Sequence, residues 1–181
     1  EIQNKFQPVP EDIKKNNLNG ILVASPANPT GSMVDKETLK NLINTAHENN
    51  VSFISDEIYH GIQYENNPTT ALEITDKCYV INSFSKYFSM TGWRIGWMIV
   101  PEDHVRQVER LSQNLFICPP HVSQLTALSA MDANIELNEN VNVYKKNREI
   151  LLEELPKAGL GKFSPPDGAF YIYVDISKYS N

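Results

Sequence analysis

The segment Ile21-Leu22-Val23-Ala24-Ser25-Pro26-Ala27-Asn28-Pro29-Thr30-Gly31 joins a short apolar run to a turn. The four apolar residues at 21–24 are typical of a strand, and the Pro-, Asn- and Gly-rich residues that follow are typical of a turn. Asp35 is suited to cap a helix, in which the apolar residues at 39, 42, 43 and 46 share one face. A strand, a turn and a helix in this order predict the first unit of an α/β fold.

Strand-like and helical patterns keep alternating after this unit. Strands are predicted at 51–54, 78–81 and 93–100, and helices at 101–115, 122–131 and 141–157. The Asn-rich stretch 132–140 is expected to be a linker, and the alternation of apolar and other residues at 168–176 predicts a last strand. The whole chain therefore has an α/β layout.

Composition and charge exclude several classes of protein. The chain has 181 residues, with 16 Lys and Arg against 22 Asp and Glu, which gives a net charge of −6. This acidic balance argues against nucleic-acid binding, and no apolar run approaches the roughly 18 residues of a membrane span. The two cysteines, Cys78 and Cys118, cannot build a disulfide framework. A reducing, cytoplasmic location is therefore expected, with neither nucleic acid nor membrane as a partner.

Polar side chains follow the first three predicted strands, at the point where each strand ends. The first strand leads to Asn28 and the second to Asp56 and Tyr59, and the third leads to the group Ser83, Ser85 and Lys86. Ligands bind at the carboxyl ends of the strands in parallel α/β sheets. We therefore expect these side chains to converge on one site.

Such a set of residues suits carbonyl chemistry. A lysine at a strand end becomes a nucleophile when its surroundings lower the pKa of its amine from about 10.4. An aldehyde cofactor such as pyridoxal phosphate needs a lysine for a Schiff base, an acid for its pyridine nitrogen and a donor for its ring oxygen. It also needs donors and a cation for its phosphate. In that order the candidates are Lys86, Asp56, Tyr59, and Ser83 with Arg94.

Three motifs carry a resemblance to a known family. They are Ser-Pro-Ala-Asn-Pro-Thr-Gly at 25–31, Asp-Glu-Ile-Tyr at 56–59 and Ser-Phe-Ser-Lys-Tyr-Phe-Ser-Met-Thr-Gly-Trp-Arg-Ile-Gly-Trp at 83–97. Their sequences, order and gaps resemble the signatures of class I/II pyridoxal-phosphate-dependent aminotransferases of fold type I, which are aspartate aminotransferase-like. The resemblance extends over almost the whole chain.

The resemblance implies a role for each matching residue. Lys86 would form the Schiff base and then move protons between the substrate α-carbon and the cofactor, and Asp56 would keep the pyridine nitrogen protonated. The ring oxygen would be bound by Tyr59 and Asn28, and Asn28 would also contact the substrate carboxylate. The phosphate would be held by Ser83 and Arg94.

Taken singly, these residues also have ordinary structural interpretations. Asn28 suits a turn, and a lone lysine such as Lys86 is usually a surface residue. Arg94 is harder to explain, because a guanidinium inside an apolar strand needs an anionic partner.

His60 has no second ligand at a suitable spacing, so no metal site is predicted. Gly96 is expected to let two elements approach closely.

The resemblance also implies the architecture. It indicates a three-layer α/β/α fold with a mostly parallel sheet, in which residues 1–135 are part of the cofactor-binding large domain. Residues 136–181 would form a linker helix and the start of an α+β small domain. A phosphate-capping Gly-rich segment and a C-terminal arginine for the substrate carboxylate are not found at the places that the family implies. We therefore expect these residues to be the middle of a longer homodimeric enzyme, inactive alone and binding the cofactor weakly.

Three functions remain open at this stage. The first is an aminotransferase of the aspartate, aromatic and kynurenine-type branch, which moves an amino group from an amino acid to a 2-oxo acid. The second is a carbon–sulfur β-lyase of the same fold, in which relatives often carry His at the position of Tyr59. The third is a non-catalytic sensory domain of a transcription regulator. The amino donor, the acceptor and the pathway do not follow from the sequence.

Overall fold

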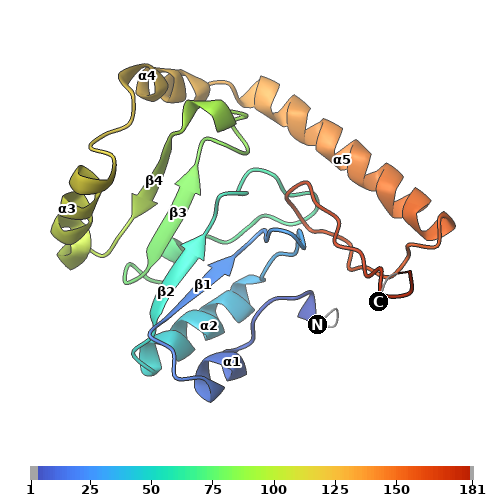
Figure 1. The fold of residues 1–181 in the computed structure, drawn as a ribbon, viewed down its shortest axis with the longest axis horizontal. Helices are drawn as coiled ribbons and strands as arrows, with labels where there is room; N and C mark the ends of the chain where they lie inside the picture. Colours follow the sequence, from blue (N-terminus) through green and yellow to red (C-terminus); the bar gives the residue numbers. More distant parts are fainter. Residues whose placement is uncertain (1–3, 180–181) are drawn as a thin grey trace.

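A four-stranded sheet forms the centre of the protein. The computed structural model describes residues 4–179, and its strands are β1 (Gly20–Ala24), β2 (Ser52–Asp56), β3 (Tyr79–Ser83) and β4 (Gly96–Ile99). They lie in the order β1-β2-β3-β4, with β1, β2 and β3 parallel and β4 antiparallel to β3 (Figure 1). The predicted α/β fold with a mostly parallel sheet is confirmed.

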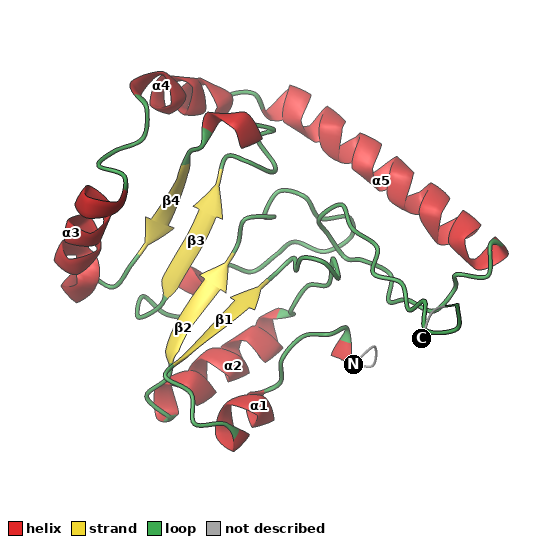
Figure 2. Ribbon diagram, in the orientation of Figure 1, coloured by secondary structure: helices red, strands yellow, loops and turns green. Residues whose placement is uncertain are grey.

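Five α-helices accompany the described sheet (Figure 2). Their bounds are α1 (Pro10–Lys15), α2 (Lys36–Glu48), α3 (Val105–Leu115), α4 (His121–Ala130) and α5 (Asn134–Lys157). Short 3-10 helices lie at η2 (Ala71–Glu73), η3 (Thr91–Trp93) and η4 (Glu102–His104). Among the residues described here, no helix is long and apolar enough to cross a membrane.

The packing of α2 on the sheet builds the main core. Asp35 caps the helix by accepting a hydrogen bond from the backbone N–H of Thr38 over 2.9 Å, as the sequence predicts. The apolar stripe of α2 then buries Leu42 and Ile43 completely against Phe53 of β2. Burying side chains of this size contributes about 1.5–3 kcal/mol each, so this contact fixes the strands on which the site is built.

Strand alternation decides which side chains of β2 face the site. Phe53, Ser55 and Glu57 are buried, while Ile54 and Asp56 between them are only half-buried. In a strand, successive side chains point to opposite faces of the sheet. Asp56 therefore lies on the face opposite to the α2 core, at the carboxyl end of the strand.

The close approach of β3 and β4 depends on Gly96. Gly96 lies opposite Ser83 in the antiparallel pair, and a Cβ atom on Gly96 would be 2.7 Å from the carbonyl oxygen of Asn82. The prediction that a small residue is needed here is confirmed.

Arg94 lies outside the strand predicted at 93–100. β4 begins only at Gly96, and Arg94 has a left-handed backbone conformation, with φ +51°, directly after η3. Its side chain is exposed, and its Nη1 donates to the carbonyl oxygen of Thr91 over 2.8 Å. The prediction of a buried guanidinium within a strand is therefore wrong, because a tight turn precedes the strand and leaves this side chain at the surface.

Two other predicted elements also differ from the structure. The segment 168–176 forms no strand and makes only the isolated bridges Gln63–Gly168 and Phe163–Val174, since a ladder needs a continuous neighbouring strand as well as a suitable alternation. The predicted linker 132–140 is helical from Asn134 onward. Leu137 is buried there, and burial of this side chain outweighs the weak helix propensity of the polar stretch.

Candidate active site

Lys86 lies in the turn after β3, close to aromatic rings from two other parts of the chain. Its Nζ atom is 5.5 Å from the centroid of the Tyr59 ring and 5.8 Å from that of Phe170. The side chain of Lys86 is half-buried. An ammonium group over an aromatic face is stabilised electrostatically, so the rings hold this amine at the carboxyl edge of the sheet.

Tyr59 is the centre of the polar contacts on this edge. Its hydroxyl lies 2.6 Å from that of Tyr171, and the Nδ2 atom of Asn28 donates to the Tyr171 hydroxyl over 3.5 Å. Tyr59 itself is buried, with only 3 % of its surface exposed. Side chains from the turn after β1, the turn after β2 and the C-terminal segment therefore meet at one point.

Burial keeps the Tyr59 hydroxyl protonated. Loss of solvent raises the pKa of Tyr59 far above its ordinary value of 10.0, and the hydrogen bond with Tyr171 acts in the same direction. Nearby negative charge on Asp56 adds a smaller upward effect on the same pKa, while Asn28 lowers it. Tyr59 is therefore a neutral hydrogen-bonding group at neutral pH.

Asp56 ends β2 beside this group. It is paired with Ala24 of β1 and Ile81 of β3, and its Oδ1 atom accepts a hydrogen bond from the backbone N–H of Ile58 over 3.2 Å. This Asx-type contact starts the turn that carries Tyr59. The carboxylate keeps lone pairs that this contact does not use, so it is able to accept a further N–H.

Ser83 and its neighbours form a compact group of donors at the end of β3. The Ser83 hydroxyl accepts from the backbone N–H of Ser85 over 3.0 Å and lies 2.9 Å from the Ser85 hydroxyl. Thr91 donates to the carbonyl oxygen of Ser85 over 2.6 Å, and Arg94 donates to Thr91. Arg94 is thus tied to the Ser83 turn through the backbone of Thr91, and its side chain is exposed.

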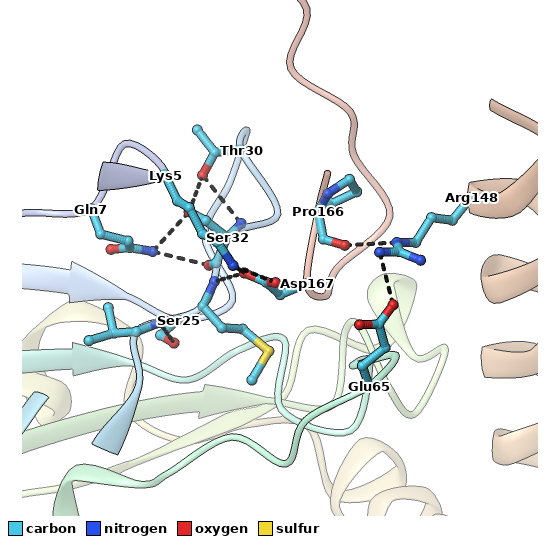
Figure 3. Close-up of polar contacts among 11 residues, drawn as sticks. Lys5, Gln7, Ser25, Thr30, Ser32, Glu65, Arg148, Pro166 and Asp167 are labelled. Carbon is cyan, nitrogen blue, oxygen red and sulfur yellow. Dashed lines mark hydrogen bonds and ion pairs between the residues drawn. The ribbon is translucent and has the colours of Figure 1, made fainter. Parts of the chain in front are cut away.

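The C-terminal segment reaches the site by folding back onto the turn after β1. The backbone N–H groups of Asp167 and Gly168 both donate to the carbonyl oxygen of Gly31, over 2.8 and 2.9 Å. The Asp167 carboxylate accepts from Met33 N–H over 3.0 Å and pairs with Lys5 at 2.9 Å. Figure 3 shows the pairing of Asp167 with Lys5.

Arg148 of α5 holds the same segment from the other side (Figure 3). Its Nε atom donates to the carbonyl oxygen of Pro166 over 2.8 Å, and its Nη2 atom is 3.4 Å from Glu65. The guanidinium also lies 5.2 Å from the centroid of the Tyr64 ring. Tyr64 in turn donates its hydroxyl to the carbonyl oxygen of Ala169. These contacts fix the position of the two aromatic residues that follow Ala169.

Comparison with known proteins settles the family. The family model described as "Aminotransferase class I and II" matches residues 1–181. The chain belongs to the class I and II aminotransferases. This family depends on pyridoxal phosphate, and its aspartate aminotransferase members share the fold type I architecture.

Individual aminotransferases are similar over the whole chain. A valine–pyruvate aminotransferase of Mycobacterium tuberculosis is 42 % identical over 99 % of the chain and 48 % of its own length. A solved structure of a candidate aminotransferase from Silicibacter pomeroyi has 60 % identity and a TM-score of 0.96, and covers 99 % of this chain and 49 % of its own. The solved structure of a Thermus thermophilus aspartate aminotransferase double mutant has 32 % identity and a TM-score of 0.90, and the match covers 98 % of this chain and 48 % of that one. The chain thus spans about half the length of these aminotransferases.

The structure brings together most of the residues predicted from the aminotransferase motifs. The Tyr171 hydroxyl hydrogen-bonds with both Asn28 and Tyr59, and the Lys86 amine lies over the Tyr59 ring. Asp56 starts the turn that carries Tyr59. The Ser83 hydroxyl donates to the carbonyl oxygen of Ile95, the residue after Arg94, so Ser83 and Arg94 are connected through the backbone of the segment that follows Lys86. The donor set therefore contains an amine, a carboxylate, hydroxyls and a guanidinium, which are the groups that pyridoxal phosphate needs.

Sequence reasoning missed Phe170 and Tyr171. Their segment was predicted as a strand, whereas the structure places both rings against Tyr59, at centroid distances of 5.5 and 5.7 Å. The signal that marks them is the run Pro165-Pro166-Asp167-Gly168, which favours a turn directly before the aromatic pair. Such a turn is able to bring the chain back onto another part of the fold, although its sequence does not predict which residues it then contacts.

A cavity of about 590 Å³ lies apart from these residues. It is lined by the N-terminal segment, the start of α2 and the loop near 66–69, including Lys5, Lys36 and Asp167. None of the predicted cofactor-binding residues lines this cavity.

Proposed function

We propose that the protein containing this chain is an aminotransferase that moves an amino group from an amino acid to a 2-oxo acid, with Lys86 as the catalytic lysine. The observation that carries the proposal is the position of the Lys86 amine over the Tyr59 ring, where Asn28, Asp56 and Tyr59 converge at the carboxyl edge of the sheet. The family membership supports the same reaction class.

Pyridoxal phosphate, when bound, supplies an aldehyde that condenses with amines and a ring that accepts electrons from the substrate α-carbon. Lys86 is the amine available to hold that aldehyde, and it takes and returns a proton at the α-carbon. Asp56 holds a proton on the pyridine nitrogen by accepting its hydrogen bond. A carboxylate in that position favours the charged form of the ring.

The remaining residues bind and orient. Tyr59 and Asn28 donate hydrogen bonds to the ring oxygen, and Asn28 also contacts the substrate carboxylate. The Ser83 hydroxyl and the Arg94 guanidinium bind the phosphate, a pairing of donor and cation that suits an anion. The exposed position of Arg94 is compatible with this role, because its guanidinium is not committed to an acidic side chain among the described residues.

Several finer expectations belong to this proposal. The substrates are an amino acid and a 2-oxo acid, and the branch is that of the aspartate, aromatic and kynurenine-type enzymes. We propose that the intact protein works as a homodimer and that residues 1–135 and 136–181 belong to its large and small domains. The cytoplasmic location expected from the scarce cysteines stays a prediction.

The test uses the intact protein, loaded with pyridoxal phosphate and given a panel of amino acids with a 2-oxo acid acceptor. We expect the wild type to transfer the amino group and to keep the cofactor covalently attached after reduction with borohydride. We expect Lys86→Ala to lose both the transfer and the attachment. Lys36→Ala is the matched control, because Lys36 is an exposed lysine that pairs with Glu73.

Three outcomes would contradict the proposal. Pyruvate release from cystathionine without an acceptor would favour the carbon–sulfur β-lyase. Cofactor binding without amino transfer to any acceptor would favour a sensory domain. Full activity in Lys86→Ala would assign the chemistry to another lysine.

A further inference from the structure

The hydroxyl of Tyr171 lies inside the group of residues that we assign to the cofactor ring. It is 2.6 Å from the Tyr59 hydroxyl and 3.5 Å from Asn28 Nδ2. Asn28 and Tyr59 are the two residues proposed to bind the ring oxygen. Tyr171 is thus the one further hydroxyl among the described residues that hydrogen-bonds with both of them.

The position of Tyr171 is fixed by backbone contacts. Gly168 N–H donates to Gly31 O over 2.9 Å, and Ala169 N–H donates to Ile62 O over 2.8 Å. Gly168 is packed so closely that a Cβ atom would be 2.6 Å from both the Ile62 carbonyl oxygen and the Pro26 ring. The segment before Tyr171 therefore has little freedom, and the hydroxyl is held in place from the same turn that carries Asn28.

Counting protons shows what this arrangement offers to a ligand. The two tyrosine hydroxyls carry one proton each, and one of the two protons lies between the oxygens. Asn28 donates to the Tyr171 oxygen, which therefore acts as an acceptor in that contact. Whichever hydroxyl donates to the other, one O–H stays available. The set presents one free hydroxyl donor beside the Asn28 amide, which suits an anionic ring oxygen.

We propose that Tyr171 is a positioning residue of the active site, whose hydroxyl orients the Tyr59 hydroxyl so that its proton faces the oxygen of the cofactor ring. This inference rests on the proposed function. With the ring oxygen bound, Tyr171 donates to Tyr59, so the Tyr59 proton leaves the pair and points at the ligand. Tyr171 acts through Tyr59, and its ring also packs on Phe170 at 4.9 Å.

The chain offers a matched control two residues further on. Tyr173 belongs to the same segment, but its ring packs edge-on against Phe6 at 5.4 Å and it is 48 % exposed. Tyr173→Phe removes the same hydroxyl from the same segment without touching Tyr59. Tyr171→Phe keeps the ring contact of Tyr171 with Phe170 and removes only its hydrogen bonds with Tyr59 and Asn28.

The experiment measures pyridoxal phosphate binding and the pH midpoint of its visible absorbance in the intact protein. A neutral hydrogen bond of this kind corresponds to about a three- to tenfold change in an equilibrium constant. We expect Tyr171→Phe to weaken binding by about that factor and to shift the midpoint by about 0.5–1 unit. Tyr173→Phe is expected to leave both unchanged. A purely structural role would lower the melting temperature without moving the midpoint.

A double-mutant cycle makes the test specific. If Tyr171 acts through Tyr59, Tyr171→Phe has no further effect on binding or on the midpoint in a Tyr59→Phe background. Equal effects in both backgrounds, or an unchanged midpoint in Tyr171→Phe, would overturn the inference while leaving the proposed function intact. Absence of cofactor binding in the wild type would instead overturn the proposed function.

Discussion

Asp167 donates its backbone N–H to the carbonyl oxygen of Gly31 over 2.8 Å, and this bond joins the C-terminal segment to the turn that carries Asn28. The two ends of the site are thus held together by main chain rather than by side chains alone. Because backbone contacts fix both partners, the spacing between Asn28 and Tyr171 depends on how closely these two turns pack.

Gly31→Ala is expected to separate these turns. Gly31 has φ +67°, and a Cβ atom there would be 2.4 Å from Pro166 Cβ and 2.8 Å from Gly168 O. Left-handed strain and overpacking together predict a loss of about 2–4 kcal/mol in the free energy of unfolding. Urea denaturation of the intact protein measures this loss.

Gly92→Ala is the control, because nothing lies within 4 Å of its Cβ position, and it should unfold like the wild type. Equal stability of the two variants would show that the turns are free to move apart.

Glu57 is expected to hold the turn that carries Asp56 and Tyr59. It is 3 % exposed, and its Oε1 atom accepts from the Ser55 hydroxyl, the Thr70 hydroxyl and Ala71 N–H at 2.8–3.0 Å. Glu57→Leu would leave two buried donors, on Ser55 and Ala71, and the half-buried Thr70 hydroxyl without this acceptor. The expected loss in the free energy of unfolding is about 3–5 kcal/mol, because each buried donor left without an acceptor costs about 1–3 kcal/mol.

Glu57→Gln distinguishes this explanation from simple packing. The glutamine keeps a carbonyl oxygen for the three donors, so its loss is expected to be only about 1 kcal/mol. Glu73→Gln, at an exposed ion pair with Lys36, should leave the melting temperature unchanged. If Leu is tolerated at position 57 as well as Gln, the hydrogen bonds of Glu57 do not hold the turn.

The parts of the fold that sequence predicts well depend on local patterns. The strand at 21–24, the Asp35 cap and the apolar stripe of α2 form as predicted because their periodicity and capping chemistry act within a few residues. Lys86 and Asp56 are placed at strand ends for the same reason. The convergence of the three strand ends then follows from parallel pairing in adjacent order.

The parts that sequence misses depend on turns and long-range returns. The exposure of Arg94 comes from one left-handed residue between η3 and β4, which an apolar run does not reveal. Tyr171 meets Tyr59 only because the segment near Gly168 packs on Gly31 and Ile62. Neither contact leaves a periodic signal, and the alternation at 168–176 instead favours a strand.

Arg148 is expected to restrain this C-terminal segment. Its side chain is 13 % exposed and contacts both Pro166 O and the Tyr64 ring. Arg148→Lys keeps the charge but loses the planar group that makes both contacts at once. We expect faster hydrogen exchange at the N–H groups of Gly168 and Ala169, with unchanged exchange in β2. Arg106→Lys, at an exposed i,i+3 pair with Glu109, is the control that should change neither. Unchanged exchange in Arg148→Lys would mean that backbone bonds alone hold the segment.

The buried thiol of Cys78 is expected to make the stability of the protein depend on pH. Burial raises the pKa of the Cys78 thiol from its ordinary value of 9.0 to about 11, and the charges of Glu57 and Asp76 act in the same direction. Between these two values the unfolded state releases the thiol proton while the folded state keeps it, so stability falls as pH rises from 9 towards 11.

Urea midpoints across this range should therefore fall less steeply in Cys78→Ala than in the wild type. Alkylation of the folded protein provides the second measurement, because Cys118 is exposed whereas Cys78 is buried. In a reaction run at pH 9, the exposed Cys118 is expected to be alkylated, and Cys78 only when the protein unfolds or the pH is raised towards 11. Rapid modification of both thiols at pH 9 would mean that the core around Cys78 opens in the native state. Parallel pH profiles of the urea midpoint for wild type and Cys78→Ala would assign the loss of stability at alkaline pH to other groups, of which the buried Tyr59 is the first to test.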